Sequence, residues 1–373
     1  MTGRQTRLLL VGRSRYALPL SPSLAKKFDA LSERFELRQL GTGTGSDPRF
    51  VLHRPLPSRA LDGAAFYLLL PWRIARQLRE FRPAAVLAQS PFEAAAALLA
   101  RRLVARRDTV PVVVELHGDP ASFARLYGSP LRRLLAPVLD RLAARTIRRA
   151  DAVRALSPFT VELARRQGVE PAAVFTTFTD LTAFSEPPVR PLPDRPRAVF
   201  VGVLERYKNV DGVAAAWRLA APRVPGARLL LVGDGRQPEP FERLVADLPG
   251  QTEWVRRLPT EEVVRVLDDS WVLLLPSRSE GTPRVILEAL CRGRGVIGGR
   301  VGGIPDAVHD GENGFLVDPA DHAGIADALV RVLSDRALAE RLGSQALADS
   351  EQWRYTPEDY AGNVAELVER VAR

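Results

Sequence analysis

The chain has 373 residues, 46% of them hydrophobic and 26% charged, which is the balance of a globular protein long enough for two or three domains. This composition excludes long disorder, collagen and coiled coils, and the longest charge-free stretches, of about ten residues, are too short to cross a bilayer. A single cysteine, Cys291, excludes an intrachain disulfide, and four scattered histidines exclude a multi-histidine metal site.

The first half alternates short apolar runs with longer stretches of helical periodicity, a pattern typical of a parallel sheet covered by helices. The first run is too short for a signal peptide, so we expect a buried strand there and a cytoplasmic protein. Predicted strands lie at 7–11, 36–40, 85–88, 110–116 and 152–156. Predicted helices lie near 22–33, 71–81, 92–105, 131–149 and 158–167. The glycine-rich segment 41–46 lacks the spacing of a nucleotide-binding fingerprint, and we predict a flexible loop.

Five prolines between Ser185 and Arg197 exclude a helix or a central strand and predict a linker. The second half repeats the alternation, with predicted strands at 198–203, 228–232, 252–255, 271–275 and 295–297. Predicted helices lie near 210–221, 239–247, 260–268, 284–292, 321–333, 335–347 and 356–371. The predicted organisation is an amino-terminal Rossmann-like domain over 1–185, a Pro-rich linker over 186–197, a carboxy-terminal Rossmann-like domain over 198–355 and a terminal helix over 356–373.

Open parallel sheets bind ligands beyond the carboxyl ends of their strands. After Leu275, the segment PSRSEGTPRVILEAL places Glu280 in a turn and Glu288 in a helix that begins near Arg284. Such a helix start presents unpaired backbone N–H groups, which suit a phosphate or a developing negative oxygen. Glu288 lies in an apolar stretch and needs a hydrogen-bonding partner, for which the hydroxyls of a ribose are one candidate. A capping Glu280 and a surface Glu288 explain the spacing equally well.

Lys208 follows the predicted strand at 198–203, at a turn into a helix where a lysine can neutralise a diphosphate. A solvated loop lysine is the alternative, which is weakened because only three of the 53 basic residues are lysines. Glycine-rich loops at 233–235, 300–308 and 311–317 allow close approach to a ligand but are also ordinary turns. The sequence has no Asp-x-Asp triplet, Walker loop or GxSxG elbow, so a diphosphate would have to be held by Lys, Arg and backbone amides.

In the first half, the predicted strand at 110–116 ends at His117, which could hold a substrate hydroxyl or move a proton there. A lone histidine is more often structural. Ser157 is expected to cap the helix that follows it and to do nothing more.

The second half resembles retaining glycosyltransferases of family 4, which have the GT-B architecture: two Rossmann-like, doubly wound parallel-sheet α/β domains that face a cleft. The resemblance rests on FVGVLERYKNVD, LLLVGDG, PSRSEGTPRVILEAL, VGGIPDAV and GENGFLV, which occur in this order within residues 196–320. REFRPAAVLAQ, VVELHG and ALSPFT in the first half are similar more loosely, and the last helix resembles the family's helix that returns to the first domain.

The resemblance implies a role for individual residues. Lys208 would neutralise the donor diphosphate, with Gly202 and Arg206 in the same loop, and Glu288 would bind the donor ribose. Glu280 would face the transferred sugar together with the backbone of Gly281, Thr282, Pro283 and Arg284. His117 would meet that sugar from the other domain, and Gly12 and Arg13 would lie on the acceptor side. The chain departs from the family at Val203, where an Arg is usual and where Arg206 would substitute, and at Asn209 and Asp306, where Gly and Glu are common.

The implied function is a retaining hexosyltransferase that needs neither metal nor cofactor and moves a sugar from a nucleotide-diphosphate sugar to a glycan, lipid-linked or small-molecule acceptor. Another GT-B enzyme, such as a nucleotide-sugar epimerase, would use a similar site. From a different class, an inactive nucleotide-sugar-binding scaffold would suit the change at Val203.

Charge is unevenly distributed: residues 1–185 contain 29 Lys and Arg against 15 Asp and Glu, and residues 186–373 contain 24 against 29. The basic residues of the first half include two helical stripes, formed by Arg73, Arg76 and Arg79 and by Arg141, Arg145 and Arg148. Solvated helix faces explain these stripes, and the alternative is a peripheral contact with an anionic membrane at its inner face. Because acidic residues are interspersed and the sequence offers no evident exposed aromatic anchor, tight insertion is not expected. Nucleic acid is not expected for want of a recognition motif.

Overall fold

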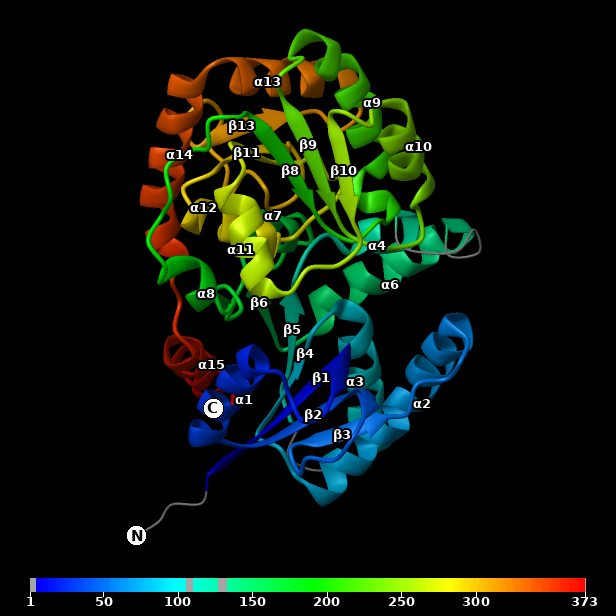
Figure 1. Ribbon diagram of the computed structural model, residues 1–373. Coiled ribbons are helices and arrows are strands. Elements are labelled where there is room, and N and C mark those ends of the chain that lie inside the picture. Colours follow the sequence, from blue (N-terminus) through cyan, green and yellow to red (C-terminus); the bar gives the residue numbers. More distant parts are fainter. Residues whose placement is uncertain (1–4, 105–109, 127–132, 373) are drawn as a thin grey trace. The chain divides into compact units, whose positions relative to one another are not determined.

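The computed structural model describes residues 5–104, 110–126 and 133–372. The chain divides into two compact units, the first comprising Met1–Ala124, Pro130–Thr179 and Tyr355–Arg373 and the second Arg125–Ser129 and Asp180–Arg354. Each unit has a parallel sheet covered by helices (Figure 1), which confirms the predicted fold class.

The sheet of the first unit has the order β3-β2-β1-β4-β5-β6-β7, with every neighbouring pair parallel. Its strands are β1 (Thr6–Ala17), β2 (Phe35–Thr44), β3 (Phe50–His53), β4 (Ala85–Ala88), β5 (Val112–Leu116), β6 (Ala152–Ala155) and β7 (Ala173–Val174). Its helices are α1 (Pro22–Arg34), α2 (Arg59–Glu80), α3 (Pro91–Leu103), α4 (Pro120–Leu126), α6 (Ala136–Arg149), α7 (Pro158–Arg166) and α15 (Pro357–Val371). The terminal helix α15 buries Tyr360 and Val364 in a core that it shares with Phe28 and Leu31 of α1.

Two predictions for this unit are wrong. The segment predicted as a flexible loop at 41–46 continues β2 as far as Thr44, because β1 extends past a register shift and pairs Arg15 with Thr42. Gly43 has φ 149°, and a Cβ there would lie 1.9 Å from the carbonyl oxygen of Tyr16, so only glycine allows the strands to approach. Helix α2 begins at Arg59 rather than near 71, since Pro71 lies inside the helix and does not begin it.

The sheet of the second unit has the order β10-β9-β8-β11-β12-β13, again all parallel. Its strands are β8 (Arg197–Val201), β9 (Arg228–Val232), β10 (Thr252–Val255), β11 (Val272–Leu275), β12 (Gly295–Gly299) and β13 (Gly314–Val317). Its helices are α8 (Thr182–Ser185), α9 (Val210–Ala220), α10 (Glu239–Asp247), α11 (Thr260–Asp268), α12 (Arg284–Cys291), α13 (His322–Ser334) and α14 (Arg336–Ser350). The prediction of a loop over 311–317 is wrong from Gly314 onward, because these residues pair with β12 as an edge strand.

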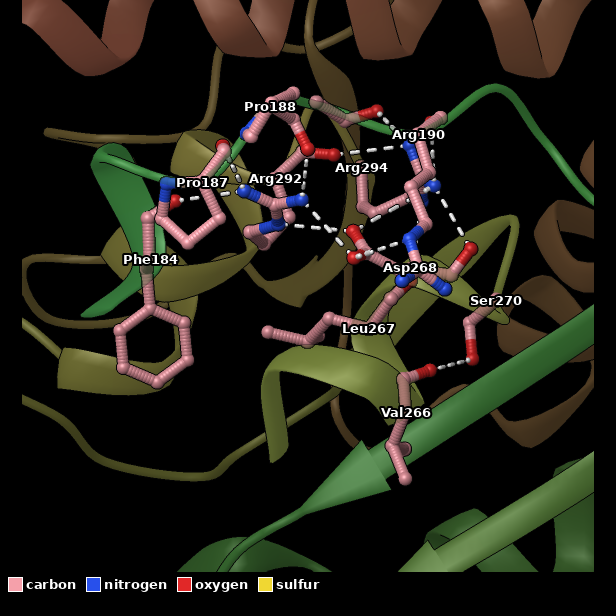
Figure 2. A network of polar contacts seen from close by, with 11 residues as sticks. Phe184, Pro187, Pro188, Arg190, Val266, Leu267, Asp268, Ser270, Arg292 and Arg294 are labelled. Carbon is pink, nitrogen blue, oxygen red and sulfur yellow. Dashed lines mark hydrogen bonds and ion pairs between the residues drawn. The ribbon is translucent and has the colours of Figure 1, made fainter. Parts of the chain in front are cut away.

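The Pro-rich segment predicted as a linker lies within the second unit, where two buried arginines hold it (Figure 2). The guanidinium of Arg292 binds both carboxylate oxygens of Asp268, at 2.8 and 2.9 Å, and also donates to the carbonyl oxygens of Pro187 and Pro188. Arg294 donates to the carbonyl oxygen of Arg190 at 2.9 Å. Prolines keep their carbonyl acceptors although they lack N–H groups, so buried arginines can fix a segment that joins no sheet.

Candidate functional site

The loop that carries Lys208 is fixed by the residue that follows it. Between β8 and α9 the chain makes a short 3-10 turn over Arg206–Lys208, and Asn209 then adopts a left-handed conformation with φ 60°. The buried side-chain amide of Asn209 donates to the carbonyl oxygens of Pro276 and Pro319, at 2.9 and 2.8 Å. Asparagine tolerates this conformation better than most residues, so it can replace the glycine common in the family and also tie the Lys208 loop to the loop after β11.

The structure brings Lys208 and Glu280 together as a buried ion pair. Lys208 Nζ lies 2.6 Å from Glu280 Oε1, and both side chains are only 10% exposed. The hydroxyl of Ser277 donates to the same carboxylate oxygen at 3.0 Å. The alternative of a solvated Lys208 is therefore wrong, because this side chain is buried. The alternative of a capping Glu280 is also wrong, because its carboxylate binds Lys208 and Ser277 and does not cap α12.

A glycine-rich loop supports the backbone at Glu280. Gly302 has φ 58°, and a Cβ there would lie 2.0 Å from the carbonyl oxygen of Glu280. The N–H of Gly303 donates to that carbonyl at 3.3 Å. These glycines allow backbone to pack on backbone and thereby position the turn that carries Glu280.

Helix α12 begins at Arg284 without a side-chain cap, so its first N–H groups remain available to an anion. Glu288, one turn along this helix, is buried, and its Oε1 accepts a hydrogen bond from Arg284 Nε at 2.7 Å. Burial raises the pKa of Glu288, and the nearby Arg284 offsets part of that rise. The alternative of a surface Glu288 is therefore wrong. Arg284 also donates to the carbonyl oxygen of Asp180 at 3.2 Å.

His117 follows β5 in the first unit, and its Nε2 lies 3.5 Å from Glu115 Oε2. Glu115 is buried and forms an ion pair with Arg154, which lies opposite it in register on β6 and is fully buried. Burial acts to raise the pKa of Glu115, but the charge of Arg154 outweighs it and holds that pKa well below its usual range. Glu115 is therefore ionised, and its carboxylate lies within reach of the imidazole. We missed this pair in the sequence, although Glu115 and His117 are two apart in VELHG and so share one face of the strand.

Two family models match this chain. The model of glycosyl transferases group 1 matches residues 185–349, and that of the glycosyl transferase 4-like domain matches residues 21–177. The chain belongs to this glycosyltransferase family. It is 31% identical over 226 residues to the D-inositol 3-phosphate glycosyltransferase of Mycolicibacterium smegmatis. This matched region covers 58% of this chain and 50% of that protein. The chain spans between about a third and a half of the length of the curated relatives that it matches.

Solved structures resemble this glycosyltransferase over nearly its whole length. Sucrose-phosphate synthase from Thermosynechococcus elongatus has a TM-score of 0.78 at 19% identity, covering 98% of this chain and 99% of that chain. The Anabaena protein HepE in complex with UDP-glucose has a TM-score of 0.70 at 16% identity, covering 98% of this chain and 100% of that chain. Identities this low establish the GT-B fold and nothing beyond it.

The remaining predicted residues of the glycosyltransferase lie as follows. Val203 and Arg206 are both exposed in the loop after β8. Gly12 lies at the register shift in β1, where a Cβ would come within 1.9 Å of Gln89 Oε1, and Arg13 forms an ion pair with Asp62 at 3.0 Å.

Ser157 caps α7 in a capping box with Thr160, as predicted. Over the described ranges 5–104, 110–126 and 133–372, no group of three or more His, Cys, Asp and Glu side chains could hold a metal ion. Within the same ranges, no helix combines the length and apolar character needed to cross a membrane.

Proposed function

We propose that this glycosyltransferase moves a sugar from a nucleotide-diphosphate sugar to an acceptor hydroxyl, with retained anomeric configuration and without a metal ion. The observation that carries the proposal is the buried ion pair of Lys208 and Glu280. Glu280 is close in sequence to the start of α12 at Arg284, which has no side-chain cap. The Lys208 ammonium, which Glu280 holds in place, and the free helix N–H groups are the donors that a diphosphate leaving group requires. The UDP-glucose bound to HepE, a protein of the same fold, supports this donor class.

The proposed chemistry separates charge between the sugar and the diphosphate. As the bond from the anomeric carbon to the diphosphate oxygen breaks, negative charge grows on that oxygen and the sugar becomes oxocarbenium-like. Lys208 and the first N–H groups of α12 stabilise the departing oxygen by preorganised electrostatics. The acceptor hydroxyl attacks from the face that the diphosphate leaves, and a phosphate oxygen takes its proton, which retains the configuration.

Other side chains hold the substrates. Glu288 accepts hydrogen bonds from the ribose hydroxyls, and Arg206 adds a second cation for the diphosphate, in place of the arginine usual at Val203. Glu280 and His117 contact the transferred sugar, with the buried Glu115 orienting the imidazole. Gly12 and Arg13 lie on the acceptor side. The acceptor is a glycan or a lipid-linked molecule, and the basic first half makes a peripheral contact with an anionic membrane.

Calorimetric titration of the Lys208→Ala variant with a nucleoside diphosphate and with the bare nucleoside tests the donor site. We expect the diphosphate affinity to fall tenfold to a hundredfold, because a hydrogen bond to a charged group contributes about 1.5 to 3 kcal/mol, and the nucleoside affinity to change little. Arg243→Ala, at an exposed position on α10 of the same unit, is the control and should change neither. Equal losses for both ligands would refute the role of Lys208. Donor binding without turnover on any acceptor would favour a scaffold.

A further inference from the structure

One face of the first unit exposes an unusual number of apolar side chains. Of the seventeen strongly exposed large hydrophobic residues among those described, ten lie on α2, on α3, or on α6 and the two residues before it. Leu68 and Trp72 of α2 are 69% and 64% exposed, and Val138 of α6 is 59% exposed. Helix α3 packs against both α2 and α6 (Figure 1), and Leu99 of α3 and Leu142 of α6 line a common hollow with Pro71 of α2. We call the exposed surface of these three helices the apolar face. Contiguous exposed apolar surface of this kind typically marks an interaction site.

A hollow of about 480 Å³ opens within the apolar face. Its walls include Tyr67 and Pro71 of α2, Phe92 and Leu99 of α3, and Leu139 and Leu142 of α6. The hydroxyl of Tyr67 donates to Glu93 at 2.9 Å, which satisfies the polar atom of the tyrosine and leaves its ring for the wall. None of the described residues that line the hollow is charged, so it suits a hydrocarbon chain better than a polar ligand.

Arginines flank the apolar face. The exposed positions in the second half of α2 include Arg76 and Arg79, and those in the second half of α6 include Arg141, Arg145 and Arg148. On α2 the exposed side changes from apolar to charged along the chain, where Arg76 pairs with the exposed Glu80 at 2.9 Å. On α6 the exposed arginines follow Val138 and flank the exposed Leu142. Apolar side chains followed by arginines complement a bilayer surface, in which acyl chains lie beneath anionic headgroups. A second copy of this chain fits less well, because it would bring two sets of arginines together.

We propose that the apolar face docks on an anionic lipid bilayer, with Leu68, Trp72 and Val138 inserted at the boundary of headgroups and acyl chains. One acyl chain occupies the hollow, and the arginines bind lipid phosphates. The inference rests on the membrane contact in the proposed function and is independent of the donor chemistry. It corrects the expectation from the sequence that an aromatic anchor is missing, since Trp72 is exposed.

Sedimentation with vesicles of phosphatidylglycerol and phosphatidylcholine tests the proposal. We expect the double variant Leu68→Ser/Trp72→Ser to bind the anionic vesicles about a hundredfold more weakly at any salt concentration. Arg141→Gln/Arg145→Gln should lose about 25-fold at low salt and little at high salt, because salt screens exposed charges. The controls Leu219→Ser and Arg195→Gln, at exposed positions of the second unit, should bind as the wild type does.

Tryptophan fluorescence with brominated lipids reports insertion directly. Trp72 is the most exposed of the five tryptophans, and bromine atoms on the upper acyl chain should quench it in the wild type. In Trp72→Phe this quenching should disappear while the vesicles still bind. Bound protein whose Trp72 is not quenched would overturn the insertion.

Three further results would overturn the inference, and they distinguish it from the rest of the proposed function. Failure to bind anionic vesicles at low salt would refute both the membrane contact and the apolar face. If the arginine variant lost vesicle binding and the apolar double variant kept it, the contact would be electrostatic and would not involve insertion. A wild-type dimer that the apolar double variant converts to a monomer would identify a second copy as the occupant. Nucleoside diphosphate binding by each variant shows that the donor site is intact.

Discussion

Replacing one member of the Lys208–Glu280 pair should destabilise the second unit far more than replacing both. At an effective dielectric constant of about 20, charges separated by 2.6 Å attract by about 6 kcal/mol before the cost of desolvation. Removal of one partner leaves the other charged and buried, which costs about 3 to 5 kcal/mol. We therefore expect losses of this size in Lys208→Met and in Glu280→Gln. The double variant should be more stable than either single variant, so the coupling energy should exceed the loss in each of them, about 3 to 5 kcal/mol.

Urea unfolding in a Trp72→Phe background measures this effect in the relevant unit. Trp217, Trp254, Trp271 and Trp353 all lie within Asp180–Arg354, so fluorescence then reports the second unit alone. The exposed pair Arg218–Asp247, also at 2.6 Å, is a matched control and should contribute less than about 1 kcal/mol. Losses below 1 kcal/mol in both single variants, with no coupling, would refute a buried pair at the donor site.

Four further outcomes are expected. Because burial raises the pKa of Glu288, its carboxylate should take up a proton at a higher pH than an ordinary carboxyl group. Donor affinity should therefore fall on acidification in the wild type and should not depend on pH in this way in Glu288→Gln. In Glu288→Ala, calorimetry should show no preference for a ribose over a deoxyribose donor, and a preserved preference would rule out the ribose contact. Glu115→Gln leaves Arg154 buried without a counter-charge, so it should destabilise the first unit by about 3 to 5 kcal/mol. The variant should also have a lower kcat, and an unchanged kcat would show that Glu115 does not position His117. Activity should persist in chelator, whereas its abolition would refute the metal-free mechanism.

Much of the fold could be predicted because buried parallel strands are short apolar runs between helices. The strands at 85–88, 228–232 and 252–255 have the predicted bounds. The wrong predictions concern segments that contain glycine or proline. The local conformational preferences of these residues gave way to pairing and packing with residues distant in the sequence. Gly43 joins β2 because β1 pairs with it, and Gly314 begins a strand because β12 lies beside it.

The candidate site could be predicted only as a set of loops. The position of Lys208 and the helix start near Arg284 were visible in the sequence, but the ion pair to Glu280 depends on how two loops meet whose paired residues are 72 positions apart. The exposure of Trp72 was likewise hidden, because the apolar run before it does not reveal which residues face the core. Leu70 and Ile74 of α2 are fully buried, whereas Leu68 and Trp72, two positions earlier in each case, are exposed.

The most direct test of the proposed function is to follow the sugar itself. The protein is incubated with a panel of nucleotide-diphosphate sugars and hydroxyl acceptors in chelator, and NMR follows nucleoside diphosphate release together with the anomeric proton of the product. The proposal predicts acceptor-dependent release, a product with the anomeric configuration of the donor, and loss of both in Lys208→Ala but not in Arg243→Ala. A product of inverted configuration, or a donor that binds and is never turned over, would contradict it.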